Sequence, residues 1–196
     1  MRTLGHLLGA TLLVGFLLSS TGSSAQSGMK YYVTWSAAGG QNIRGSVIQK
    51  GRENTTLGHS LSHEVFLPRD ASGAPTGKLQ HKPMSMVLDL DAATTSLMTV
   101  LAQNGVIPTV TIRCYKAGTT ATGSTGTEVQ YYTMTLTNAT IGSIQTAIGP
   151  GTPTNQFESA NTNSTTTSGS DLIRITLYYQ QINTNYTGAG SFQGNF

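Results

Sequence analysis

The chain has 196 residues, of which only 10% are Asp, Glu, Lys or Arg, and its formal net charge is +3. Its basic residues are too few and too scattered to form a nucleic-acid-binding surface, so we expect no nucleic-acid partner. The single cysteine, Cys114, excludes an intramolecular disulfide. The protein must therefore be stabilised by packing or by assembly with other copies.

The first 25 residues have the three parts of a secretory signal peptide. Arg2 gives the start a positive charge, residues 7–18 form an apolar run, and a small-residue stretch ends at Ala25. The run is about 12 residues long, whereas a helix that spans a membrane needs ~20. We expect cleavage after Ala25, export of the mature chain, and no stable membrane insertion after cleavage. An uncleaved anchor or a wrongly chosen start codon remains the alternative.

Short segments with strand character dominate the rest of the chain. The predicted strands cover residues 30–35, 43–49, 59–67, 83–90, 108–115, 129–136, 139–146 and 172–182. One helix is expected after Asp91 or Thr94, either of which can cap it, and Asn104-Gly105 supplies its end. This pattern predicts an all-β fold, either a sandwich or a barrel, with one short helix.

Three polar segments are expected to lie outside the strands. Residues 70–77 form a turn-rich loop, and residues 149–170 are a Thr- and Asn-rich low-complexity loop insertion. Residues 187–196 are polar and Gly-rich, which predicts a flexible tail. The chain thus divides into a signal peptide at 1–25, one domain at 26–186 that is large enough for a core, and this tail.

The histidines are the first candidates for a metal site. His59, His63 and His81 could converge, with Glu64 close by in sequence. A zinc protease needs two histidines four residues apart on a helix with a glutamate between them. Here the histidines lie on a predicted strand, and Glu64 points to its other face. We therefore favour histidines that form hydrogen bonds at a loop edge or a subunit contact, and we expect no metal.

The residues that could carry catalysis have simpler structural uses. Asp89 and Asp91 could form a carboxylate pair, but Asp91 is better placed to cap the helix that follows. Cys114 lies within a predicted strand, which favours a buried structural thiol over a nucleophile. The sequence contains no Gly-x-Ser-x-Gly turn for a serine nucleophile. We therefore expect no enzyme activity, no catalytic residue and no cofactor.

Between residues 59 and 144 the chain carries an ordered series of short motifs. They are His59-Ser-Leu-Ser-His63, Pro68-x-Asp70-x-Ser72-Gly73, Gly77-Lys78, His81-x-Pro83, Asp91 with Leu97 and Leu101, Val110-x-Ile112-x-x-Tyr115, Glu128-x-x-Tyr131-Tyr132 and Leu136-x-Asn138-Ala139-x-Ile141-x-Ser143-Ile144. Each motif is weak alone, but together and in this order they are specific. The chain resembles the haemolysin-coregulated protein (Hcp) family, the inner-tube subunit of type VI secretion systems. The resemblance extends more loosely over residues 30–186.

The resemblance implies a compact β-barrel of two antiparallel sheets with one short helix at its side. It implies that six copies form a ring, that rings stack into a hollow tube or filament, and that the lumen carries small protein cargo. The implied partners are other copies of the chain, type VI secretion components and this cargo. A loop between residues 68 and 83 is implied to contact the next ring. Its candidate contact residues are Pro68, Asp70, Ser72, Gly73, Gly77, Lys78, His81 and Pro83.

The signal peptide and the resemblance indicate different places of assembly, because the family's tube is built inside the cell. We favour a secreted protein that is exported through the inner membrane and polymerises outside the cell. One alternative is a tube or carrier component of a type VI machine, assembled in the cell. The other is a secreted single ring or monomer that binds a ligand or partner, with the loop at 149–170 as a recognition element.

Overall fold

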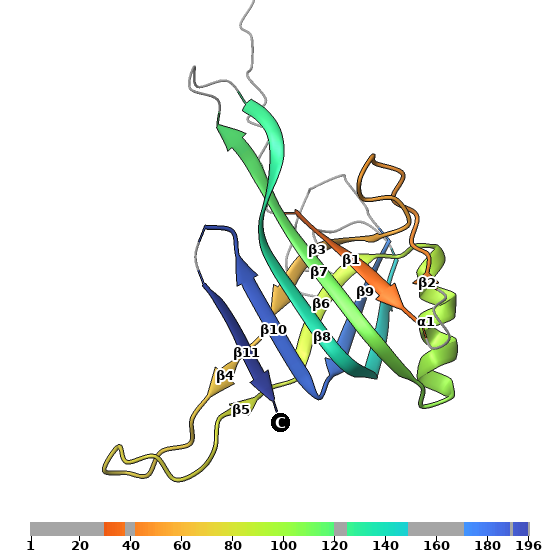
Figure 1. Ribbon diagram of the computed structural model, residues 1–196. Helices are drawn as coiled ribbons and strands as arrows, with labels where there is room; N and C mark the ends of the chain where they lie inside the picture. The colour runs from red at the N-terminus through yellow and green to blue at the C-terminus, as the bar shows by residue number, and fades with distance from the viewer. Residues whose placement is uncertain (1–29, 38–41, 120–124, 149–170, 189, 196) are drawn as a thin grey trace, which may run out of the picture.

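The computed structural model describes residues 30–37, 42–119, 125–148, 171–188 and 190–195 (Figure 1). The predicted signal peptide and the predicted loop at 149–170 lie outside these residues, so both stay predictions. Among the described residues, no helix has the length and apolar character needed to cross a membrane.

Six antiparallel strands close into a barrel. In order around it they are β8 (Thr125–Ala147), β7 (Val106–Thr119), β1 (Lys30–Ser36), β3 (Thr56–Ser62), β6 (Met84–Asp89) and β9 (Leu172–Tyr178), and β9 pairs back with β8. Closure satisfies the backbone groups that an open sheet would expose at its two edges. The predicted all-β barrel with one short helix is therefore confirmed.

On the side away from β7, the strand β8 pairs with two different strands along its length. Its first half pairs with β10 (Gln181–Tyr186), which in turn pairs with β11 (Ser191–Asn195), and its second half pairs with β9. The change of partner falls at Asn138, which has a positive φ of 50°. Pro108 lies opposite Asn138 in the register with β7 and has no amide hydrogen to donate. The ladder is thus interrupted where β8 bends, and β10 and β11 lie beside the barrel as an extension of its sheet.

Inward-facing residues alternate along each strand and fill the barrel interior. The core also includes Leu97 from the helix and Ile182 from β10, and its fully buried members are Val33, Trp35, Met84, Met86, Leu88, Leu97, Val110, Ile112, Leu136, Ile173, Ile175, Leu177 and Ile182. The indole nitrogen of Trp35 donates a hydrogen bond to Thr56 Oγ1 at 3.2 Å, so this large buried ring leaves no polar atom unsatisfied. Burial of these side chains is the main force that holds the strands together.

The helix α1 (Ala92–Ala102) begins as the sequence predicts, and both candidate caps take part. Asp91 is the N-cap and accepts a hydrogen bond from the Ala93 amide at 2.9 Å, while the Asp91 amide donates to Thr94 Oγ1 at 3.1 Å. This reciprocal pair is a capping box. The helix ends as Asn104 turns to a φ of 48° and the Gly105 amide donates to the Val100 carbonyl.

One predicted strand is mostly absent. Of residues 43–49, only Ile43 lies in a strand, at the end of β2 (Asn42–Ile43). The chain after it folds back on itself, because the Gly45 amide donates to the Asn54 carbonyl and the Asn54 amide donates to the Val47 carbonyl. This fold-back needs a glycine, since a Cβ on Gly45 would lie 2.2 Å from the Thr55 carbonyl oxygen.

Two further expectations are corrected. The barrel is not made of two sheets, because its six strands belong to one nine-stranded sheet, and the only other sheet among the described residues is the two-stranded pair of β4 (Val65–Phe66) and β5 (Gln80–His81). The expected flexible tail at 187–196 contains β11, whose five residues all pair with β10. The polar, Gly-rich composition of these residues does not predict a strand. An outer strand needs few apolar residues, because its neighbour supplies the hydrogen bonds.

Candidate assembly surfaces

Residues 64–82, which we call the arm, project from the barrel as a hairpin (Figure 1). The arm contains β4, β5 and the loop between them, and it leaves the barrel on the side away from α1. Seven of the eight predicted contact residues lie on it, and Pro83 follows directly. Asp70, Ser72, Gly73, Gly77, Lys78 and Pro83 are exposed, whereas Pro68 and His81 are partly buried. The structure therefore brings the predicted residues together on one protruding element.

The tip of the arm is ordered by a single carboxylate. Asp70 Oδ1 accepts hydrogen bonds from the Ser72 amide at 2.9 Å, the Ser72 hydroxyl at 2.7 Å and the Ala74 amide at 2.9 Å. Ser72 is the main cause of the lowered pKa of Asp70, and the Ala74 amide adds to it. An isolated bridge between Arg69 and Pro75 closes the turn. The tip of the arm is therefore ordered by contacts within the single chain.

The root of the arm is held by His63, His81 and Tyr179. The hydroxyl of Tyr179 lies 2.5 Å from His63 Nε2, and the two imidazole rings stack with centroids 5.6 Å apart. Tyr179 is 8% exposed and sits between β9 and β10, where the sheet passes from the barrel to its extension. Burial lowers the pKa of both histidines, and for His63 the neighbouring His81 lowers it further. The two rings are therefore held in their neutral form at neutral pH.

The third candidate histidine lies apart from this pair. His59 Nε2 is 2.6 Å from Asp89 Oδ1, across the pairing of β3 with β6. Within the described residues, no three His, Cys, Asp or Glu side chains come together in a group that could hold a metal ion. Asp89 and Asp91 also have separate uses, because Asp89 binds His59 and Asp91 caps α1.

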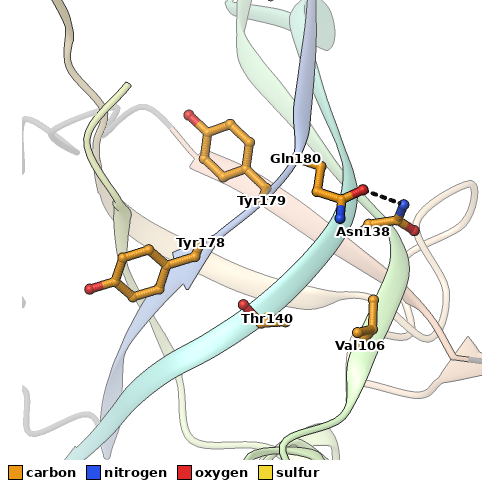
Figure 2. Close-up of a pocket in the computed structure, with 6 residues that line it drawn as sticks. All are labelled: Val106, Asn138, Thr140, Tyr178, Tyr179 and Gln180. Atoms are coloured by element: carbon orange, nitrogen blue, oxygen red, sulfur yellow. Dashed lines mark hydrogen bonds between the residues drawn. The ribbon is translucent and has the colours of Figure 1, made fainter. Parts of the chain in front are cut away.

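A pocket of about 460 Å³ lies at the fork where β8 changes partner (Figure 2). It is lined by Val106, Asn138, Thr140, Tyr178, Tyr179 and Gln180. Tyr178 and Val106 are about half exposed, at 54% and 49%. None of the six carries a formal charge at neutral pH, so this surface offers amide, hydroxyl and aromatic contacts rather than acid–base or metal chemistry.

A second pocket of about 220 Å³ is lined by residues of β1, β3, β7 and β8. Its lining includes Tyr31, Leu61, Cys114, Tyr132 and Met134. Burial raises the pKa of Cys114 to about 11, so the thiol is protonated at neutral pH. Since the thiolate is the reactive form, the environment of Cys114 does not suit a nucleophile.

Residues 32–186 match the family model described as Type VI secretion system effector, Hcp. This match covers most of the chain and includes the barrel, the arm and β10. The chain belongs to the Hcp family.

One curated relative of this Hcp chain is the "Major exported protein" of Pseudomonas aeruginosa. The two are 34% identical over 102 residues, which span 52% of this chain and 56% of the relative. The aligned region is thus about half the length of either protein.

Solved Hcp structures share the fold. A mutant form of the Hcp1 protein from the E. coli EAEC 042 pathovar superposes with a TM-score of 0.68 at 20% identity, over 85% of this chain and 98% of that one. The secreted protein Hcp3 from Pseudomonas aeruginosa gives a TM-score of 0.61 at 20% identity, over 86% of this chain and 98% of that one. At these identities the likeness establishes the architecture of the barrel and no more.

Sequence reasoning missed two features of this Hcp chain that position its surfaces. The strand predicted at 172–182 includes Tyr179, although the alternation that continues through Tyr178 and Tyr179 ends at the consecutive glutamines 180 and 181. No sequence pattern indicates the burial of Arg52, which is 7% exposed. Its guanidinium lies over the rings of Tyr32 and Tyr115, at 4.6 and 3.6 Å from their centroids, and forms an ion pair with Glu128. No local pattern marks such an arginine, because its partners come from distant strands.

Proposed function

We propose that this protein is a structural subunit that forms six-membered rings, and that these rings stack into a hollow tube or filament. The proposal includes export by the signal peptide at 1–25 and assembly outside the cell. Its partners would be other copies of the same chain, with small protein cargo in the lumen. We expect no enzymatic activity, since the role of the subunit is to build the wall of the tube.

The observation that carries the proposal is the shape of the arm on an Hcp barrel. The arm reaches away from the barrel, its tip is ordered by Asp70, and the residues near the tip are small or uncharged apart from Arg69, Asp70 and Lys78. A projection that is already ordered loses little conformational entropy when it binds. The arm is therefore suited to contact a neighbouring ring. Head-to-tail contacts of this kind generate closed rings or filaments.

The proposed assembly outside the cell has a direct alternative, which is assembly inside the cell. A machine component assembled inside the cell would use the same barrel and arm, and the family match supports membership of the type VI secretion system. The name of the Pseudomonas aeruginosa relative and the apolar run at 7–18 favour export. A single secreted ring or monomer that binds a ligand remains the third possibility, and the pocket that contains Cys114 is the feature that favours it.

The mass of the purified chain without residues 1–25 tests the ring. We expect sedimentation or light scattering to give six times the subunit mass, together with larger species that are multiples of it. The variant Asp70→Ala should retain the six-membered ring but lose the larger species, because the tip of its arm is no longer ordered.

A matched control is Glu53→Ala. Glu53 Oε2 accepts a hydrogen bond from the Gly51 amide at 2.9 Å, so this carboxylate orders an exposed turn outside the arm. The control should stack like the wild type. Deletion of residues 72–76 should abolish stacking altogether, and a deletion variant with unchanged tube length and stability would contradict the role of the arm.

A further inference from the structure

The root of the arm joins three parts of the chain that are distant in sequence. His63 directly follows β3, His81 lies in β5, and Tyr179 lies at the junction of β9 and β10. The ring of Tyr179 lies 6.0 Å from that of His63 and 6.2 Å from that of His81, centroid to centroid. These three rings join the arm to the barrel, whereas the two residue pairs of β4 and β5 join only the two strands of the arm to each other.

The outer strand β11 packs against one of these rings, that of His81. A Cβ on Gly194 would lie 2.8 Å from His81 Nε2, so the backbone of β11 comes as close to this imidazole as a glycine allows. The cluster therefore has little room to admit the water that an imidazolium needs. Any rearrangement of His81 must move either β11 or the arm.

The charged and titratable groups beside the two imidazoles come from the arm and the β9–β10 junction. The arm brings Glu64 and Lys82, whose Oε2 and Nζ atoms form an exposed ion pair at 2.8 Å. The junction brings Tyr179, whose pKa is raised by burial to about 12, so it stays a neutral hydroxyl. Because Glu64 is already paired, protonation would place two cations with centroids 5.6 Å apart in a partly buried cluster.

We propose that His63 and His81 form a pH-sensitive switch that fixes the arm when both rings are neutral and releases it when they are protonated. The proposal rests on the proposed function, because release matters for assembly only if the arm joins rings. In the fixed state the Tyr179 hydroxyl and His63 Nε2 share a hydrogen bond. Protonation of His63 leaves this nitrogen able only to donate in that bond, and repulsion between the two charged rings opens the root.

The direction of the switch follows from the burial of the two rings. Both histidines have pKa values below the ordinary value of about 6.5. The opened arm, with solvated rings, therefore binds protons more readily than the fixed arm. Fixation is complete above about pH 6.5 and weakens as the pH falls through this value towards the lowered pKa values.

Hydrogen–deuterium exchange at pH 7.5 and pH 5.0, corrected for the intrinsic pH dependence of exchange, tests the switch within a single subunit. We expect the protection of residues 64–82 to fall at least tenfold at pH 5.0, while that of β7 is unchanged. The variants His63→Gln and His81→Gln should each reduce this response. The control His59→Gln should keep it in full, because His59 pairs with Asp89 outside the cluster.

Each outcome of this experiment has a definite meaning. Equal protection of the arm at the two pH values would overturn the switch, as would a full response in the His63→Gln and His81→Gln variants. Tyr179→Phe provides a second test of the switch, since it should lower the protection of the arm at pH 7.5 without any change in charge. A response of the arm in a chain that never forms rings would support the switch and contradict the proposed function.

Discussion

The side-chain amide of Asn138 donates a hydrogen bond to Gln180 Oε1 at 2.8 Å, directly across the fork where β8 exchanges β10 for β9 (Figure 2). A second bond, from the Gln180 amide to the Thr137 carbonyl, lies beside it. Asn138 thus combines a left-handed backbone with a cross-strand hydrogen bond, and both features stabilise the bend of β8. The fork fixes the direction in which β10 and β11 leave the barrel, and with them the position of Gly194 over His81.

Replacement of Asn138 should separate the contribution of its left-handed backbone from that of its hydrogen bond to Gln180. Asn138→Ala loses the hydrogen bond and places an alanine at positive φ, so we expect the free energy of unfolding to fall by about 1–2 kcal/mol. Asn138→Gly keeps the backbone conformation and should cost about 1 kcal/mol less than Asn138→Ala. Urea denaturation of both variants measures this difference. Equal stability of the two variants would show that the left-handed backbone is not a constraint.

Arg52 should be among the most sensitive polar residues of the protein. It is nearly buried, it packs between Tyr32 and Tyr115, and its removal leaves Glu128 without its partner. We expect Arg52→Ala to cost about 3 kcal/mol, and Arg52→Lys to recover only part of this, because an ammonium cannot stack as a planar guanidinium does. Thermal denaturation provides the measurement. An Arg52→Lys variant as stable as the wild type would contradict the stacking argument.

The same ion pair predicts a loss of stability in acid. The hydrogen bond from Arg52 lowers the pKa of Glu128 below its ordinary value of about 4.3. The folded state therefore binds fewer protons than the unfolded state in this range, so the contribution is present above about pH 4.3 and is lost as the pH falls further. Glu128→Gln should flatten this part of a plot of unfolding free energy against pH. A slope that is unchanged in Glu128→Gln would assign the acid sensitivity to other carboxylates.

Gly58 should tolerate no side chain. A Cβ at this position would lie 2.0 Å from Tyr31 Cε2, and the hydroxyl of Tyr31 is anchored to the carbonyls of Ser60 and Val87. We expect Gly58→Ala to cost about 3 kcal/mol or to prevent folding. Gly77→Ala is the control, because its Cβ would approach no atom closer than 3.6 Å. Soluble yield and melting temperature of the two variants test this prediction. Equal values for Gly58→Ala and Gly77→Ala would contradict the clash with Tyr31.

The cap of α1 gives a smaller and more specific prediction. Asp91 accepts hydrogen bonds from the Ala93 amide at 2.9 Å and from the Ser46 amide at 3.1 Å, so it joins the helix to the loop after β2. We expect Asp91→Ala to lower the free energy of unfolding by about 1–2 kcal/mol, whereas Asp91→Asn should cost about half as much, because an amide oxygen can still cap the helix. Guanidinium denaturation with both variants tests this order, and the reverse order would refute it.

Local patterns predicted the elements that depend on neighbours in sequence. Strand-type composition predicted β1, alternation predicted β9, and Asp91 as a candidate cap predicted the start of α1. The break predicted between residues 136 and 139 falls on the bend at Asn138, although β8 runs on through it. These features follow from side-chain periodicity and capping, which are properties of short segments.

Features that depend on distant partners could not be predicted in this way. The bond between His63 and Tyr179 joins residues 116 positions apart, and neither residue stands in a pattern that indicates the other. The strand β11 exists because β10 offers a ladder to it, not because its own sequence favours a strand. The arm was located by resemblance to Hcp, whereas its ordered tip and its histidine root required the structure.

Negative-stain electron microscopy of the purified chain without residues 1–25, beside cell-free culture supernatant, tests the central claim most directly. We predict stacked rings or tubes in both samples, because the proposed function combines export with self-assembly. Rings from the purified protein with an empty supernatant would contradict assembly outside the cell and would place the subunit in a machine built within it.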